Sequence, residues 1–129
     1  MCRPPLLNSE SYISAYTHII KTEKVFRALS DRTRLHLMLL LLGEDRLCVC
    51  ELVHALDASQ SRISRHLGQL RDLGMVLDER RGQWVYYRLH PALPEWVQRV
   101  LDTAAEAESL QPIQTRLAGM PNRPLAGCD

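Results

Sequence analysis

The amino-acid sequence predicts a mainly α-helical fold that contains a single β-hairpin. Apolar residues recur at helical spacing through most of the chain, and a tight turn separates two predicted helices near its centre. Directly after these helices the pattern changes to one typical of strands. With 129 residues, of which 46% are hydrophobic and 24% charged, the chain has the size and composition of one globular domain. Together these observations predict a winged helix-turn-helix.

In the first third of the chain, the residue pattern predicts a flexible arm followed by helices. Residues 1–10 contain two adjacent prolines and are expected to form a flexible N-terminal arm. Residues 12–29 carry apolar side chains at positions that fit one or two amphipathic helical segments. Ser30 or Asp31 can cap the strongly apolar helix that follows, and Gly43 can end it.

Hydropathy predicts where the protein resides. The longest apolar run, residues 37–42, is far below the roughly 20 residues that a membrane-spanning helix needs. The first ten residues contain one arginine and no apolar run of signal-peptide length. We therefore expect a cytoplasmic protein with no membrane partner, in a compartment where thiols stay reduced.

The centre of the chain has the pattern of a helix-turn-helix. Residues 47–56 predict a short helix of about two turns, and Asp57–Ala58 predict a tight turn. Ser59 can cap the next helix and Gly74 can end it. The second helix has one apolar stripe, made by Ile63, Leu67, Leu70 and Leu73. Small polar residues and arginines fall on its opposite side.

A hairpin and a last helix complete the predicted domain. Residues 75–77 and 84–89 predict two strands, joined by a polar tip at residues 78–83 in which Gly82 makes the turn. Residues 91–110 predict an amphipathic helix that begins with proline. The folded domain is thus expected to span residues 11–110, and the proline- and glycine-bearing residues 111–129 to form a flexible C-terminal tail.

The exposed side of the second central helix carries side chains that suit DNA. Six arginines against three acidic residues make residues 58–88 locally basic in a chain with a net charge of +1. Serine lets a helix approach base edges, glutamine can pair with adenine, and arginine can bind guanine or phosphate. The alternative is an amphipathic helix and hairpin whose arginines are merely solvated; His66, beside the apolar stripe, is assigned to packing. We predict that double-stranded DNA is contacted by Gln60, Ser61, Arg62, Ser64, Arg65 and Gln69 and, in the hairpin, by Arg80 and Arg81.

Four motifs carry a resemblance to a known family: "ALSDRTRL", "LCVCEL", "SQSRISRHLGQLRDLG" and "RRGQWVYYRL". From about Val25 to Trp96 the chain resembles the ArsR/SmtB family of metal-responsive winged-helix repressors, and most of all its arsenic-sensing branch. The resemblance implies a homodimer formed by the first and last helices. It also implies two recognition helices on a palindromic DNA operator and release of that DNA when metalloid binds.

The resemblance also implies a use for the closely spaced Cys48 and Cys50. The spacing suits neither a zinc ribbon nor an unstrained disulfide. Inside a regular helix the two side chains would point about 200° apart. At the first turn of a helix, or just before it, both can turn inward, and the positive end of the helix favours thiolate. We predict that Cys48 and Cys50 bind arsenite or antimonite; the alternative is two small buried hydrophobic side chains.

The third ligand departs from the pattern of the arsenic-sensing branch, which often reads C-V-C-[DE]-L-C. Val53 stands where the third thiol would be, and the adjacent His54 is a harder donor that is assigned to the helix surface. The third donor is Cys2, Cys128 or a cellular thiol such as glutathione. The zinc site found on the last helix of other family members is discounted, because residues 95–110 contain acidic residues but no histidine.

The predicted function is therefore an arsenite- or antimonite-responsive transcriptional repressor without an organic cofactor. One alternative keeps the DNA binding and changes the signal to cadmium, lead, zinc or thiol oxidation. An architectural DNA-binding protein that ignores thiols is another. A thiol enzyme is less favoured, because the chain has neither a C-x-x-C motif nor a cysteine in a phosphate-cradling loop.

Overall fold

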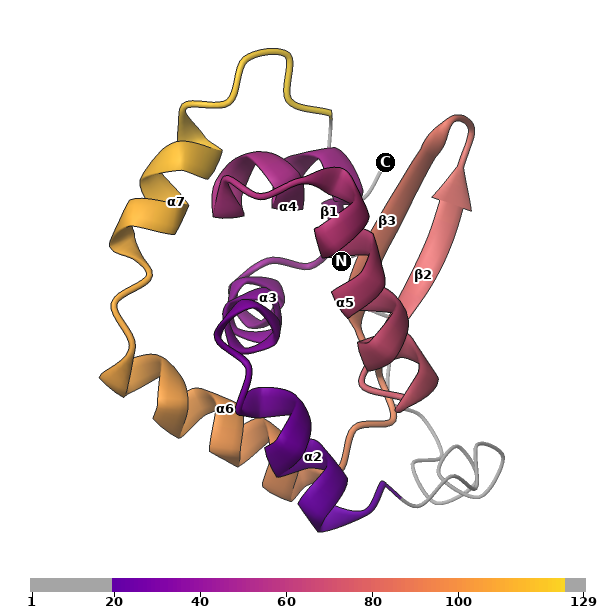
Figure 1. Ribbon diagram of the computed structural model, residues 1–129, viewed down its shortest axis with the longest axis vertical. Coiled ribbons are helices and arrows are strands. Elements are labelled where there is room, and N and C mark those ends of the chain that lie inside the picture. The colour runs from indigo at the N-terminus through magenta and orange to yellow at the C-terminus, as the bar shows by residue number, and fades with distance from the viewer. Residues whose placement is uncertain (1–19, 125–129) are drawn as a thin grey trace.

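The computed structural model describes residues 20–124, and Figure 1 shows the arrangement of its helices around a small sheet. The elements in chain order are α2 (Thr22–Leu29), α3 (Arg32–Gly43), β1 (Leu47–Cys48), α4 (Val49–Leu56), α5 (Gln60–Asp72), β2 (Val76–Arg81), β3 (Trp84–Leu89), α6 (Glu95–Ala107) and α7 (Gln111–Ala118). The predicted mainly α-helical fold with a hairpin wing is confirmed.

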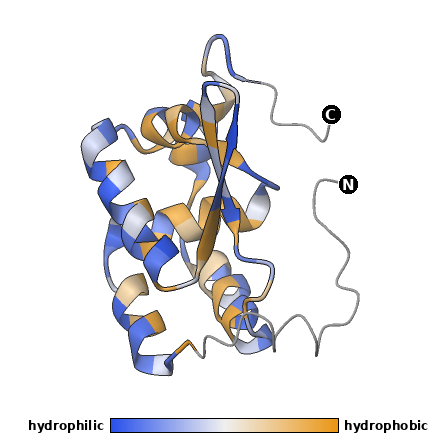
Figure 2. Ribbon diagram, turned by 90° about the vertical axis from the view of Figure 1, so that its right-hand side faces the viewer, coloured by the Kyte–Doolittle hydropathy of each residue, from blue (hydrophilic) through white to orange (hydrophobic). Residues whose placement is uncertain are grey.

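Helix α3 forms the centre of the core. Figure 1 shows it end-on, with α2, α4, α5 and α6 around it. Its apolar residues point in all directions, and residues 37–41 are all buried, as expected for a helix enclosed by neighbours. In Figure 2 the apolar residues lie mainly on the inward faces of the helices. No helix within residues 20–124 is long and apolar enough to cross a membrane.

Local capping sets the ends of the two best-defined helices. Of the two residues expected to cap α3, Asp31 does so, because its carboxylate accepts the backbone N–H of Arg34 at 3.1 Å. Ser59 caps α5 as predicted, accepting the backbone N–H of Arg62 at 3.2 Å. Between α4 and α5, Asp57 adopts a left-handed conformation with φ of 52°, which makes the tight turn of the helix-turn-helix.

The sheet is antiparallel, with strand order β1-β3-β2. Two expectations are wrong here. Leu47 and Cys48 are not the start of a helix but a short strand that pairs with Tyr87 and Tyr86 of β3. The hairpin tip is also shorter than predicted: residues 78–81 continue β2, and the turn is confined to Gly82, with φ of +61°, and Gln83. Residues 78–81 extend beyond the core and bury neither face, so they are polar throughout and lack the alternating pattern that predicts a strand.

The C-terminal region corrects a further expectation. Residues 111–118 form helix α7 rather than part of a flexible tail, and α7 packs against α4 (Figure 1). Its buried residues are Ile113 and Leu117, and Arg116 Nε donates to the carbonyl oxygen of Ala55 at 2.8 Å. The predicted N-terminal arm, the first part of the helical segments predicted for residues 12–29, and residues 125–129 lie outside the described residues, as do Cys2 and Cys128.

Candidate functional site

Helix α5 separates its side chains into a buried and an exposed face. Ile63, His66, Leu67 and Leu70 are buried against the rest of the domain. The predicted DNA-contacting residues of this helix are all exposed: Gln60, Ser61, Arg62, Ser64, Arg65 and Gln69. The face therefore presents hydroxyl, amide and guanidinium groups together, which are the groups that read base edges and phosphates in other proteins.

Three of these residues also have partners within the protein, and the Oγ atom of Ser61 lies 3.4 Å from that of Ser59. Arg62 Nη2 donates to Thr33 Oγ1 at 3.1 Å, and Gln69 Oε1 accepts from Arg34 Nη1 at 2.8 Å. The bond from Arg34 uses one of the two lone pairs of the Gln69 amide oxygen and holds the side chain in one orientation. Gln69 therefore links α3 to α5 in addition to its predicted role in DNA contact.

Arg34 on α3 is a positioning residue that the sequence analysis missed. Its Nε donates to the carbonyl oxygen of Ala28 at 2.9 Å, and its Nη1 lies 3.3 Å from Nδ1 of His66. Since a guanidinium can only donate, His66 Nδ1 must accept and the imidazole is neutral. Burial lowers the pKa of His66, which favours the same form. His66 packs inside the domain as predicted, and the contact links α3 to α5.

The hairpin of β2 and β3 projects from the domain as a wing (Figure 1), with Arg80 and Arg81 exposed near its tip. Arg81 Nε lies 3.2 Å from Glu79 Oε2, in an ion pair at the surface where solvent screens it strongly. Such a pair leaves the arginine available to an anionic partner.

The two thiols meet at the junction of β1 and α4. Cys48 is the last residue of β1 and the N-cap of α4, and Cys50 is in the first turn of that helix. Their Sγ atoms lie 2.7 Å apart, so both side chains turn to the same side, as the position at a helix start predicts. Cys48 is buried and Cys50 is half-buried. The pair can act as a bidentate sulfur donor.

The protonation state of this pair differs from the expectation. Burial, the hydrogen bond to Cys48 and the nearby Glu51 raise the pKa of Cys50 to about 12. The predicted stabilisation of thiolate by the start of the helix is therefore outweighed by burial and by a neighbouring carboxylate. Cys50 is a protonated thiol at neutral pH.

Glu51 has a fully buried side chain that joins the thiol pair to the C-terminal segment. Its Oε1 accepts the backbone N–H of Cys48 at 2.7 Å, and its Oε2 accepts from Arg123 Nε. Arg123 Nη2 also lies 3.4 Å from Glu44 Oε1. The signal in the sequence was the three-residue spacing of Cys48 and Glu51, which matches a capping box with cysteine in place of serine.

A second set of contacts runs from the thiol pair to the wing. Cys48 pairs with Tyr86 of β3, and the guanidinium of Arg46 lies over the Tyr86 ring at 5.2 Å. Arg46 Nη1 is 3.6 Å from Glu79, which in turn pairs with Arg81 of the wing. One continuous chain of contacts thus connects the start of α4 with a predicted DNA-contacting arginine.

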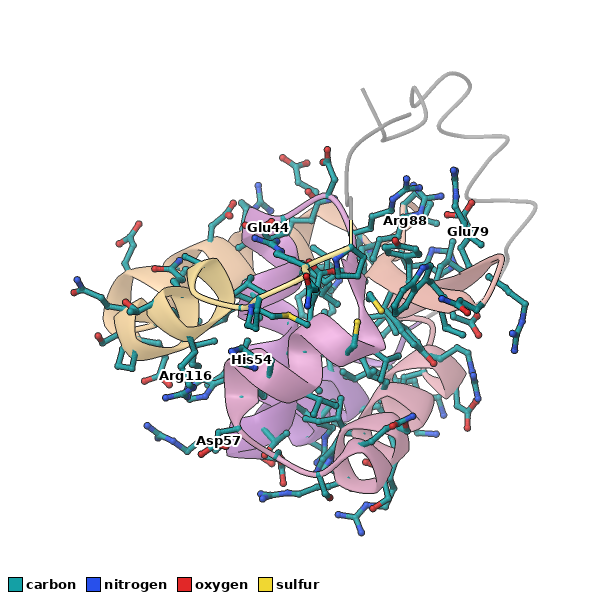
Figure 3. The ribbon with its side chains drawn as sticks, turned by 90° about the horizontal axis from the view of Figure 1, so that it is seen from above. Glu44, His54, Asp57, Glu79, Arg88 and Arg116 are labelled. Carbon is teal, nitrogen blue, oxygen red and sulfur yellow. The ribbon has the colours of Figure 1, made fainter. Side chains whose placement is uncertain are left out.

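The described residues do not supply a third ligand. Within residues 20–124 no three His, Cys, Asp or Glu side chains converge in a way that could hold a metal ion. His54 is exposed and lies close to Arg116 of α7 in Figure 3, on the side of α4 away from the wing residues Glu79 and Arg88. The thiol pair is the part of the predicted site that the structure brings together.

Comparisons with known proteins agree with this architecture. The sequence model described as "Bacterial regulatory protein, arsR family" matches residues 31–77. The chain is 54% identical over 102 residues to the arsenic resistance transcriptional regulator ArsR1 of Pseudomonas putida, covering 78% of this chain and 80% of that protein. It is 47% identical over 97 residues to the arsenical resistance operon repressor of Escherichia coli K12, covering 74% and 83%.

A solved structure has the same fold. Reduced HlyU of Vibrio cholerae N16961 superposes with a TM-score of 0.59 at 28% identity, covering 78% of this chain and 97% of that one. A helix-turn-helix with a polar outer face, a wing beside it and this degree of similarity define a DNA-binding transcription regulator rather than an enzyme. The chain belongs to the ArsR family of bacterial regulatory proteins.

Proposed function

We propose that this protein is a cytoplasmic, arsenite- or antimonite-responsive repressor that binds operator DNA as a homodimer and releases it when Cys48 and Cys50 bind the metalloid. The observation that carries the proposal is the position of the thiol pair. It lies where β1, which pairs with the wing strand β3, meets α4, the first helix of the helix-turn-helix. A ligand that rearranges this junction acts on both DNA-contacting elements.

The chemistry of the pair favours a metalloid over a divalent cation. Arsenite at neutral pH is the uncharged As(OH)₃, and each thiol that binds it forms an As–S bond and releases one water, with the thiol proton leaving in that water. No net proton is released, so the raised pKa of Cys50 does not oppose capture. Cadmium or zinc binding requires thiolates and must expel those protons to solvent. The names of the two relatives support the same inducer class.

Coupling to DNA follows from the contacts around the pair. Metalloid binding fixes two sulfur atoms in one geometry and so moves the start of α4 and the strand pairing of Cys48 with Tyr86. The displacement reaches α5 through the turn at Asp57 and reaches Arg81 through Arg46 and Glu79. The ligand shifts the protein between two shapes only by the difference in its affinity for them.

The proposed dimer interface uses α2 and α6. Phe26 is 50% exposed although it is a large apolar side chain, and its ring centroid lies 6.2 Å from that of Trp96 on α6. Burial of this aromatic pair against a second copy would remove apolar surface from water. A dimer would also place two α5 helices on the two halves of a palindromic operator.

The third sulfur ligand in this proposal is Cys2, Cys128 or a cellular thiol such as glutathione. The alternative function keeps the DNA binding and senses cadmium, lead, zinc or thiol oxidation. The 2.7 Å separation of the two sulfur atoms favours thiol oxidation among these signals. No organic cofactor enters either proposal.

One titration separates these functions. The protein is bound to a fluorescent duplex from the promoter of its own gene under reducing conditions, and arsenite, antimonite, cadmium and zinc are added in turn. Release by arsenite and antimonite at far lower concentrations than by cadmium or zinc is expected. Release by cadmium or zinc alone would establish the alternative, and failure of the protein to bind DNA would contradict both.

A further inference from the structure

We infer that a cleft lined by three arginines, which adjoins the outer face of α5, binds a phosphate of the DNA backbone and brings helix α7 into the DNA interface. This arginine cleft is defined by Arg32, Arg62 and Arg116. The inference rests on the proposed DNA binding and extends it to a part of the chain outside the helix-turn-helix and the wing.

The cleft is formed by elements that are distant in the sequence. It has a volume of about 340 Å³, and its arginines come from α3, α5 and α7. Leu56 and Ala58, which flank the tight turn between α4 and α5, form part of its wall. Its position beside this turn makes it continuous with the exposed face of α5, to which Arg62 also belongs.

The charge of the cleft is strongly positive. No lining residue is acidic, and the carboxylate of the nearby Glu108 is engaged by His36 Nε2 at 2.9 Å. Arg62 uses one guanidinium nitrogen on Thr33, and Arg116 uses its Nε on Ala55, so each keeps further N–H donors. Among residues 20–124 the guanidinium of the exposed Arg32 has no hydrogen-bond or ion-pair partner.

A backbone phosphate is the ligand that fits these groups. Forked guanidinium groups match the paired oxygen atoms of a phosphodiester and bind them with charge-assisted hydrogen bonds. Two of the arginines are held in place by contacts within the protein, which reduces the ordering that binding requires. A duplex on α5 carries its phosphates on either side of the groove that the helix enters, next to the turn that forms the wall of the cleft.

Helix α7 contributes Arg116 to this cleft. Figure 3 shows Arg116 on the same side of the molecule as Asp57, the residue that makes the tight turn. The bond from Arg116 Nε to Ala55 fixes the arginine against the C-terminal end of α4. Helix α7, which was expected to be part of a flexible tail, therefore places a cation beside the helix-turn-helix of α4 and α5.

The test compares single-arginine variants of the full chain by fluorescence anisotropy, on a promoter duplex and on a scrambled duplex, over a range of salt concentrations. Arg32→Ala and Arg116→Ala should each weaken binding to both duplexes by about three- to tenfold and reduce the salt slope by about 1, as for loss of one phosphate contact. Arg99→Ala is the matched control, since it removes an equal charge from α6, where Arg99 pairs with Glu95. Because α6 also belongs to the proposed dimer interface, sedimentation must first show that this variant has the oligomeric state of the wild type.

Further variants and a competition experiment distinguish loss of a phosphate contact from other causes of weaker DNA binding. Arg32→Ala removes no hydrogen bond or ion pair within residues 20–124, so its result does not depend on the bond from Arg116 to Ala55. Arg116→Lys loses that bond but keeps the charge of the cleft, and so separates the two contributions of Arg116. Competition with inorganic phosphate at constant ionic strength tests a free oxyanion as the ligand. Equal losses in the control, or Arg32→Ala and Arg116→Ala variants that bind both duplexes like the wild type, would overturn the inference. The inference would also be overturned by an Arg32→Ala or Arg116→Ala variant that inorganic phosphate no longer displaces from DNA but that binds DNA as tightly as the wild type. Wild-type protein that binds no duplex would contradict the proposed function instead.

Discussion

Arg123 pairs with the fully buried carboxylate of Glu51 and thereby ties the segment that follows α7 to the first turn of α4. The same carboxylate accepts the backbone N–H of Cys48, so one side chain joins the thiol pair, its helix and the C-terminal segment. Loss of Arg123 would leave a buried charge without its cation.

We expect Arg123→Ala to destabilise the protein by about 2–4 kcal/mol, because an uncompensated buried carboxylate is costly and Arg123 itself is partly solvated. Urea denaturation followed by circular dichroism measures the loss. The double variant Arg123→Ala/Glu51→Gln removes the stranded charge and keeps an acceptor for Cys48, so it should recover part of the stability. A single variant as stable as the wild type would show that the pair contributes nothing.

The two thiols should be needed for induction and dispensable for DNA binding. Cys48→Ser and Cys50→Ser each keep the size of the side chain but replace a soft sulfur donor with a hydroxyl that binds arsenite poorly. Each variant should bind a promoter duplex within about twofold of the wild type and resist release by arsenite. Cys2→Ser and Cys128→Ser serve as matched variants, and insensitivity of either one would identify the third ligand. Normal release of the Cys48→Ser/Cys50→Ser protein would refute the site.

Arg65→Ala should weaken DNA binding without changing stability. Arg65 is exposed on α5, opposite the buried stripe, and an arginine contact to a base or phosphate is worth about 1–3 kcal/mol. Anisotropy titration on specific and scrambled duplexes distinguishes a base contact, which is lost on the specific duplex alone, from a phosphate contact. Unchanged affinity on both duplexes would remove Arg65 from the interface.

The stability of the domain should depend on the protonation of His66. Its pKa is lowered in the folded protein from the ordinary value of 6.5, mainly by burial, so the unfolded chain binds the proton more readily. Stability from the neutral form is therefore present above pH 6.5 and is lost as the pH falls through the folded-state pKa. Protonation also breaks the contact in which Arg34 donates to Nδ1. Urea denaturation at a series of pH values should show this loss in the wild type and in His54→Gln, whose changed histidine is exposed, but not in His66→Gln.

Cys50 should be slow to alkylate. With a pKa of about 12, its thiolate fraction at pH 8 is roughly a thousandfold below that of a thiol with the ordinary value of 9.0. In a Cys2→Ser/Cys128→Ser background, iodoacetamide labelling followed by mass spectrometry measures the rate at this site. Labelling as fast as that of a free cysteine would show that Cys50 is ionised or exposed, and the argument for metalloid selectivity from proton balance would fail.

The elements that sequence reasoning placed correctly are those specified locally. Asp31 and Ser59 cap α3 and α5 through bonds to residues only three positions away, and the apolar stripe of α5 is continuous. The same holds for the turn at Asp57. Local pattern was therefore sufficient to predict the helix-turn-helix and the position of the thiol pair at a helix start.

What the sequence did not predict depends on partners far along the chain. Helix α7 has eight residues, and its apolar residues Ile113 and Leu117 gain their significance from packing against α4. The pairing of Arg123 with Glu51 spans 72 positions, and that of Arg34 with His66 spans 32. The protonated state of Cys50 was missed for the same reason, since burial by the folded chain outweighs the local effect of the helix start.

The strand order of the sheet has a consequence for solubility. In the order β1-β3-β2, strand β2 is an edge strand whose outer backbone groups have no neighbour within the sheet. An edge of this kind can template the addition of a strand from another molecule. Here the outer half of β2 reads Asp78, Glu79, Arg80 and Arg81, four charged residues in succession. An incoming strand would have to desolvate these charges, so the wing arginines that are predicted to contact DNA also disfavour aggregation at this edge.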